Sequence, residues 1–219
     1  MRLAWLGRLE GFKIPILLHT IRRLEAITDL RLELDILGDG ADEAFISNSC
    51  ADLRKLKIRM LGKVAHDELD ERLSTYHLLF AMGTSALEGA RLGLPTFCLD
   101  YSYESITKVY RYRLLHECVG YNVGEQITEA HYEPFSTLER RLGELIDRYA
   151  EESGLAHAYW RTHHAPEAVL EKFITAIDGA QCSFAEIASH GLGQRDFVTQ
   201  WIDRFAKSSG GVNAGFQSR

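Results

Sequence analysis

The chain has 219 residues, 46% apolar and 26% charged, with a formal net charge of −6. These proportions are ordinary for a soluble globular protein, and the length allows one substantial core. The acidic balance disfavours a nucleic-acid binder, no apolar run is long enough to span a membrane, and the N-terminus has no signal-peptide pattern. The four cysteines form no Cys-x-x-Cys pair, so we expect reduced core thiols and a cytoplasmic protein.

The first hundred residues predict alternating strands and helices. The expected strands are residues 2–6, 32–37, 58–64, 78–82 and 96–99. The expected helices are residues 14–26, 42–56 with Asp42 as N-cap, 67–74 and 85–92. This alternation predicts an α/β fold with a Rossmann-like parallel sheet and helices on both of its faces. Ligands of such sheets bind beyond the carboxyl ends of the strands.

The pattern changes after Asp100. The aromatic and basic residues 101–116 predict a loop and a helix, and residues 120–124 a turn or short edge strand. Further helices are expected at residues 136–152, 167–177 and 194–206. We therefore expect a main domain at 1–178, a helical C-terminal extension at 179–206 and a disordered tail at 207–219.

Two of the strand ends carry residues suited to an anionic ligand. Gly7, Arg8 and Lys13 follow the first strand, whereas the turn from Gly83 to Ser85 joins the fourth strand to a helix. The first N–H groups of a helix lack internal partners, and the helix dipole favours negative charge there. Purely structural readings stay open, in which Arg8 pairs with Glu10 and Lys13 is solvated.

Four segments occur in one order along the chain. They are Gly7-Arg8-Leu9 with Lys13, Gly38-Asp39-Gly40, Leu61-Gly62-Lys63-Val64, and the run from Glu88 to Pro95 with sequence EGARLGLP. Together they resemble the nucleotide-sugar-binding C-terminal half of glycosyltransferases with the GT-B fold, especially the retaining family 4. The resemblance covers residues 2–100 well and residues 120–177 loosely.

The resemblance implies a role for individual residues. Arg8 and Lys13 would bind the diphosphate and stabilise the charge that develops on this leaving group, without a metal ion. Glu88 would accept hydrogen bonds from the ribose hydroxyls, because a carboxylate is an acceptor only. Ser85-x-x-Glu88 is also the pattern of a capping box, which is the structural alternative for Glu88.

The resemblance implies that the other donor-binding positions act through their backbone and, at Thr84 and Ser85, also through their hydroxyl groups. Gly7 would allow close approach of the ligand, and Gly38 is also expected to be a donor-binding position. Gly83, Thr84 and Ser85 would offer donors to the phosphates. Val64 lies where similar proteins read the nucleobase through main-chain groups, so UDP, GDP and ADP donors all stay open. The resemblance implies no cofactor and no metal site.

The sequence differs from the family at one position, and it corresponds to only one of the two halves of a GT-B enzyme. Many retaining members have a second glutamate eight residues before the first, where this chain has Phe80. The acceptor-binding half would precede Met1, so we expect an acceptor-binding domain or partner subunit, with membrane association only through that partner. We therefore expect a glycosyltransferase or the donor-binding part of one. The alternatives are a catalytically silent nucleotide-sugar-binding subunit and a UDP-sugar epimerase-like enzyme.

Overall fold

A six-stranded sheet organises the N-terminal part of the chain in this computed structural model, which describes residues 1–135 and 137–190. The strand order is β3-β2-β1-β4-β5-β6. The strands are β1 (Arg2–Leu6), β2 (Glu33–Leu37), β3 (Lys57–Gly62), β4 (Leu78–Ala81), β5 (Thr96–Cys98) and β6 (Arg113–Leu114). All neighbouring strands pair in parallel except β6, which is antiparallel to β5.

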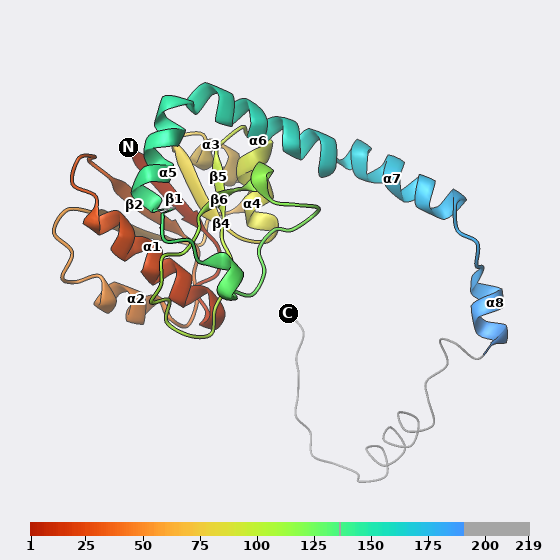
Figure 1. Cartoon of the computed structure of the whole chain (residues 1–219), viewed down its shortest axis with the longest axis horizontal. Coiled ribbons are helices and arrows are strands. Elements are labelled where there is room, and N and C mark those ends of the chain that lie inside the picture. Colours follow the sequence, from red (N-terminus) through yellow and green to blue (C-terminus); the bar gives the residue numbers. More distant parts are fainter. Residues whose placement is uncertain (136, 191–219) are drawn as a thin grey trace, which may run out of the picture. The chain divides into compact units, whose positions relative to one another are not determined.

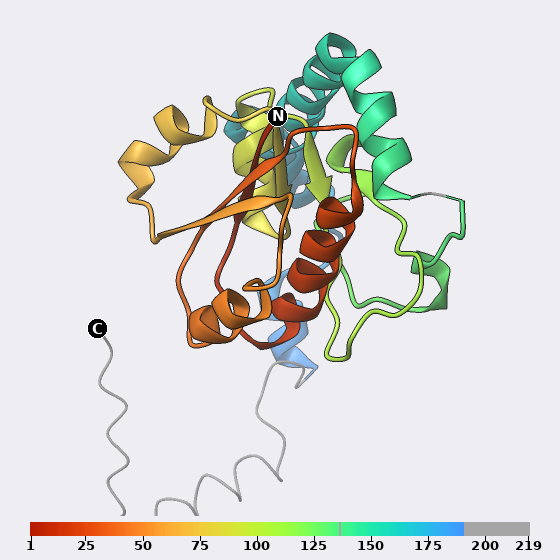
Figure 2. The ribbon, with the colours of Figure 1, turned by 90° about the vertical axis from the view of Figure 1, so that its left-hand side faces the viewer.

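Helices cover both faces of the sheet (Figures 1 and 2). The helices of the first unit are α1 (Ile14–Ala26), α2 (Glu43–Ser49), α3 (Leu69–Leu73), α4 (Thr84–Arg91), α5 (Leu138–Asp147) and α6 (Tyr149–His163). Apolar residues of α1, α2 and α5 pack in one cluster with the sheet, whereas those of α3, α4 and α6 pack in a second cluster. The predicted fold class, a Rossmann-like sheet with helices on both faces, is confirmed.

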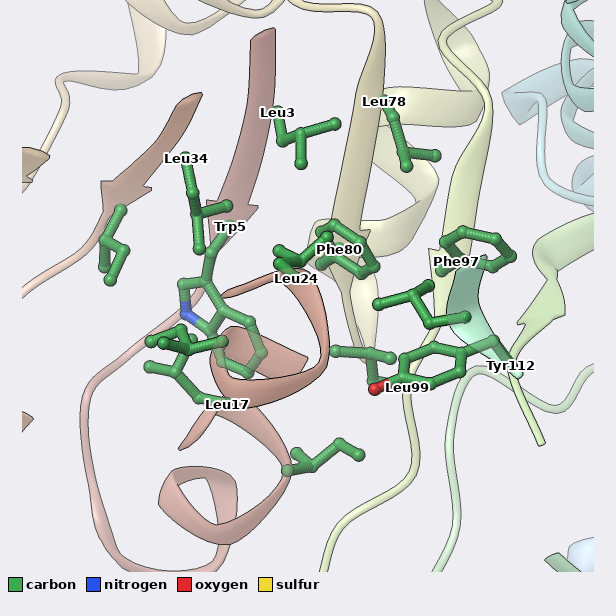
Figure 3. Packing of buried hydrophobic residues seen from close by; sticks show 14 of the residues in the cluster. Leu3, Trp5, Leu17, Leu24, Leu34, Leu78, Phe80, Phe97, Leu99 and Tyr112 are labelled. Carbon is green, nitrogen blue, oxygen red and sulfur yellow. The ribbon is translucent and has the colours of Figure 1, made fainter. Parts of the chain in front are cut away.

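Alternation along the strands explains the two clusters. Leu3 and Trp5 of β1 belong to the cluster that contains α1, whereas Ala4 between them belongs to the cluster that contains α4. Figure 3 shows Trp5 and Phe80 among leucines of the sheet and of α1, including Leu17. Strands that are buried on both faces are nearly continuous apolar runs, as β4 is.

The chain divides into two compact units, Met1–Leu170 and Glu171–Arg219. Helix α7 (Pro166–Asp178) begins in the first unit and ends in the second, which also contains α8 (Phe184–Ser189). The helix expected at residues 194–206 and the tail expected at 207–219 lie outside the described residues. None of the helices described here is both long and apolar enough to cross a membrane.

Two expected helices differ from the structure. Helix α2 ends at Ser49 rather than near residue 56, and the Asp42 side chain accepts a hydrogen bond from Gly11 N (2.8 Å) instead of capping α2. The helix expected at residues 136–152 is two helices, α5 and α6, because Arg148 leaves the helical conformation (φ −118°, ψ 23°).

The expected helix within residues 101–116 is wrong. This segment contains β6, which pairs with β5, followed by a 3-10 turn at Leu115–Glu117. Tyr110 and Tyr112 are buried in the core, whereas the alternating Arg111 and Arg113 are only partly buried. A period of two residues is the pattern of a strand and explains the difference.

Candidate functional site

The chain builds the sheet outward from β1 in one direction through β2 and β3. It then returns to add β4, β5 and β6 on the other side of β1. Leu6 at the end of β1 lies opposite Ala81 at the end of β4. The chain leaves β1 toward α1 on one face of the sheet, and it leaves β4 toward α4 on the other face. In open α/β sheets, ligands bind outside the carboxyl ends of the strands at such a switch point. The segments that begin at Gly7 and Met82 flank this point.

Gly38 determines how the segment after β1 is supported. Gly38 has φ +152°, and a Cβ atom there would lie 2.0 Å from the carbonyl oxygen of Gly7. Gly7 N donates to Leu37 O (3.1 Å), and Gly38 N donates to Gly62 O (2.8 Å). The backbones after β1, β2 and β3 are therefore locked together, which only a residue without a side chain permits at position 38.

The two cations after β1 differ in environment. The Arg8 side chain is 70% exposed and pairs with Glu10 (3.3 Å), so the structural alternative considered for Arg8 is present in the structure. Lys13 is the last residue of the 3-10 turn Gly11–Lys13 and precedes α1. Burial, and then the charge of Arg8, lower the pKa of Lys13, while Glu10 opposes this shift. Lys13 is therefore a partly desolvated ammonium group rather than a solvated surface lysine.

The Lys13 ammonium group lies at the glycine after β1. A Cβ atom built on Gly7 would be 3.7 Å from Lys13 Nζ. The structure thus brings Gly7 and Lys13 together at the switch point. The charges of Arg8 and Glu10 both shift the pKa of Lys13, in opposite directions, so these three side chains form one electrostatic group.

Helix α4 begins directly after β4. Gly83 is its N-cap, with φ +63°, and its N–H donates to Val123 O (2.6 Å). No side chain caps α4, and within the described residues the amides of Thr84 and Ser85 have no hydrogen-bond acceptor. The first turn of α4 therefore presents free N–H groups, which is the arrangement that binds anions at helix starts.

Glu88 lies one turn into α4 and bonds to a residue of its own helix. Its Oε2 atom accepts from Arg91 Nη2 (3.0 Å), and Arg91 in turn binds Asp70 of α3. Glu88 is not part of a capping box, because its described contacts are with Arg91 and not with the start of the helix. Its side chain is 27% exposed. Glu88 makes no described ion pair with Arg8 or Lys13.

Gly89 explains how α4 approaches the sheet so closely. A Cβ atom at this position would lie 2.4 Å from Thr96 Oγ1 and 2.6 Å from the Leu79 side chain. A larger residue would push α4 away from β4 and β5. The glycine therefore positions the carboxylate of Glu88 relative to the strand ends.

The remaining expected positions lie elsewhere. Val64 follows β3, two strands away from β1, and is partly buried against the second apolar cluster. Phe80 is fully buried in β4, and its ring stacks on Phe97 with centroids 5.5 Å apart (Figure 3). Position 80 therefore faces the core and does not reach a ligand at the strand ends.

Two residues near the strand ends were not identified from the sequence. The carboxylate of Asp100, just after β5, is fully buried and binds Arg113 (2.8 Å) and the hydroxyl group of Tyr110 (2.8 Å). Trp5 in β1 is buried, and its indole Nε1 has no hydrogen-bond partner among the described residues. Both look like ordinary core or strand residues in the sequence, which carries no signal for their polar contacts.

One group of side chains has the composition of a cation site. Oxygen or nitrogen atoms of Asp100, Glu125 and His131 lie within 4.8 Å of one another. Both oxygens of Asp100 already accept hydrogen bonds from Arg113, and Oδ1 also accepts from Glu125 N. The guanidinium group supplies the positive charge that this buried carboxylate needs. The group is therefore explained as part of the fold.

Comparison with solved structures defines the class of fold. A structure of Anabaena HepE in complex with UDP and glucose superimposes with a TM-score of 0.50 at 12% identity, covering 82% of this chain and 48% of HepE. TarM of S. aureus, in a complex that includes UDP, gives a TM-score of 0.54 at 16% identity, covering 81% of this chain and 35% of TarM. The fold is that of a GT-B glycosyltransferase domain.

The chain spans less than half the length of both structures. No protein-family model matches its sequence, and no curated protein sequence is similar enough to count as a relative. At these identities the likeness concerns the fold.

Proposed function

We propose that this chain binds a nucleotide diphosphate sugar and supports transfer of the sugar to an acceptor, in the manner of family 4 glycosyltransferases. The observation that carries the proposal is the switch point between β1 and β4. There the Lys13 ammonium group lies beside Gly7, and the neighbouring strand β4 leads into the free amides of α4. A partly desolvated cation and free backbone donors are suited to a diphosphate group.

Each residue has a role in this proposal. Lys13 and Arg8 stabilise the negative charge on the diphosphate as the bond to the sugar breaks, so the reaction needs no metal ion. Gly7 and the turn from Gly83 to Ser85 allow the backbone to approach the phosphates, supported by Gly38. Glu88 accepts hydrogen bonds from the ribose hydroxyls. Val64 reads the nucleobase through its backbone.

The ligands of the two structural neighbours support this reading. HepE was crystallised with UDP and glucose, and the TarM complex also contains UDP. The chain spans 48% and 35% of these proteins, so we propose that the acceptor site belongs to a further domain or a partner subunit. A cytoplasmic location, with membrane contact only through such a partner, is part of the same proposal.

Isothermal titration with UDP, GDP and ADP tests the proposal. We expect one of the three to bind the folded chain, and Lys13→Gln to weaken binding about tenfold or more, because one charge-assisted contact is lost. Lys55→Gln is a matched control, since Lys55 is exposed in the loop before β3, at the edge of the sheet away from the proposed site. Failure of all three nucleotides to bind would overturn the proposal.

A catalytically silent donor-binding subunit is the second candidate. The observation that favours it is Phe80, which is buried in the core at the position where many retaining enzymes have a second glutamate. A donor-hydrolysis assay on the chain alone separates the two. Turnover that is lost in Lys13→Gln would exclude the silent subunit, whereas tight binding without any turnover, alone or with a co-purified partner, would favour it.

A further inference from the structure

The indole group of Trp5 is buried without a hydrogen-bond acceptor. Trp5 is the fourth residue of β1, and only 1% of its surface is exposed. Nε1 is a donor only, and within the described residues nothing accepts its hydrogen bond. Figure 3 shows the ring beside Leu17 of α1. A buried donor without a partner is costly, so its position calls for an explanation.

The space beside Gly7 connects this donor to Lys13. A Cβ atom built on Gly7 would lie 3.6 Å from Trp5 Nε1 and 3.7 Å from Lys13 Nζ. Both nitrogen atoms are donors, so they cannot bond to each other. An oxygen atom at that Cβ position would lie 3.6 Å from Trp5 Nε1 and 3.7 Å from Lys13 Nζ, so both side chains would have to move by about 0.5–1 Å for it to accept from both. We call this space, bounded by Trp5 Nε1, Lys13 Nζ and Gly7 Cα, the Gly7 oxygen site.

We propose that the Gly7 oxygen site holds one non-bridging phosphoryl oxygen of the diphosphate, with Trp5 Nε1 and Lys13 Nζ as its two donors. This inference rests on the proposed function and adds Trp5 as a ligand-binding residue. It also gives Gly7 a specific task. The glycine leaves open the volume that the oxygen occupies, in addition to allowing the backbone to approach.

Gly7→Ala is the sharpest variant, because it fills the site without disturbing the fold. The added methyl group would meet nothing closer than 3.6 Å outside the neighbouring residues, which is an ordinary van der Waals distance, and Gly7 does not have a positive φ. We expect Gly7→Ala to unfold at the same temperature as the wild type and to lose nucleotide diphosphate affinity by about tenfold or more. Gly143→Ala, at an open position in α5, is the matched control.

The indole signals of Trp5 provide a readout that does not depend on activity. The chain has three tryptophans, Trp5, Trp160 and Trp201, so its ¹⁵N NMR spectrum contains three indole N–H signals. Trp5→Phe assigns the Trp5 signal and removes the donor while retaining an aromatic ring. On titration with pyrophosphate, and with whichever of UDP, GDP and ADP binds, we expect the Trp5 signal to move downfield while that of Trp160 stays in place.

The outcomes separate this inference from the proposed function. If a nucleotide binds the wild type but the Trp5 signal does not move and Gly7→Ala binds equally well, the Gly7 oxygen site is wrong and the proposed function stands. If none of the nucleotides binds the folded wild type, both fail. A shift of the Trp5 signal together with weaker binding by Gly7→Ala supports the inference, even if Trp5→Phe does not fold.

Discussion

Arg91 joins Glu88 on its own helix to Asp70 on the neighbouring helix α3. Its Nη2 atom donates to Glu88 Oε2 (3.0 Å), and its Nη1 atom donates to Asp70 Oδ2 (3.0 Å). The hydrogen bond from Arg91 is the largest cause of the lowered pKa of Asp70. The bridge leaves Glu88 with one oxygen, Oε1, outside the ion pair. In the proposed function, Arg91 is therefore a positioning residue that orients the carboxylate for the ribose.

Arg91→Ala tests this positioning role. We expect nucleotide affinity to fall by about three- to tenfold, because Glu88 loses its fixed orientation and its partial neutralisation. The free energy of unfolding should fall by at most about 1 kcal/mol, since the ion pairs are partly exposed. Arg140→Ala breaks an exposed pair with Glu144 and should leave affinity unchanged. Tighter nucleotide binding by Arg91→Ala would mean that Arg91 competes with the ribose for Glu88.

Glu88→Gln separates ribose binding from phosphate binding. The amide retains the shape of the side chain but lacks the charged acceptor, so we expect about a tenfold or larger loss of affinity for the nucleotide. Affinity for pyrophosphate, which has no ribose, should stay the same or rise slightly. Calorimetry with both ligands measures this difference. Glu71→Gln, at an exposed position of α3, is the control. Equal losses of affinity for the nucleotide and for pyrophosphate in Glu88→Gln would contradict the ribose role.

The lowered pKa of Lys13 predicts that both stability and diphosphate affinity depend on pH. Burial lowers this pKa below the ordinary lysine value, so the folded protein loses the proton at a lower pH than the unfolded chain does. Between the lowered and the ordinary pKa the unfolded chain binds more protons, so the contribution of Lys13 to stability rises with pH in that window. Affinity for a diphosphate should instead fall as pH rises through the lowered pKa, because binding needs the ammonium form.

Calorimetric titrations with the bound nucleotide from pH 7 upward measure this effect. Lys13→Arg retains its charge throughout the range, so its affinity should stay flat where that of the wild type falls. A wild-type profile that stays flat up to the ordinary lysine range would contradict the combination of a lowered Lys13 pKa and a contact with the ligand, and the affinity of Lys13→Gln at pH 7 shows which of the two fails.

The alternating strands and helices could be predicted from the sequence. Buried residues recur at a characteristic spacing in each kind of element, and that spacing is visible in the order of apolar residues. Helix α1 matches its expected bounds, and Gly7 and Gly83 lie at the strand ends where the pattern placed them. The helical spacing of apolar residues could not reveal the break between α5 and α6 at Arg148. The apolar face of α5 continues to Tyr149, and only the one residue between the two helices is non-helical. The residues that lead into β6 already alternate in the sequence, with buried Tyr110 and Tyr112 between arginines.

Side-chain partners in the candidate site could not be predicted in the same way. Glu88 matches both a capping box and a ribose acceptor in sequence. Its i,i+3 pair with Arg91 is local, whereas the contact of Arg91 with Asp70 depends on where α3 lies. Likewise, Trp5 is one apolar residue within a strand. Its indole nitrogen becomes informative only once α1 folds back and places Lys13 beside Gly7. Contacts between distant segments decide these roles, and they leave no local pattern.

Asp100→Asn should destabilise the fold strongly. The carboxylate of Asp100 is fully buried after β5 and accepts bonds from Arg113, Tyr110 and the backbone of Glu125. Asp100→Asn retains the shape but leaves the Arg113 side chain, which is 16% exposed, without its counter-charge. Breaking one partner of a buried ion pair typically costs about 3–5 kcal/mol, so we expect a loss of this size in urea unfolding.

Two comparisons make the Asp100 prediction specific. Glu129→Gln removes the exposed ion pair with Lys108 and should cost about 1 kcal/mol or less, because water already solvates both groups. Adding Arg113→Met to Asp100→Asn removes the uncompensated charge and should recover part of the lost stability. If Asp100→Asn costs no more than Glu129→Gln, the buried network does not hold the segment after β5 against the sheet.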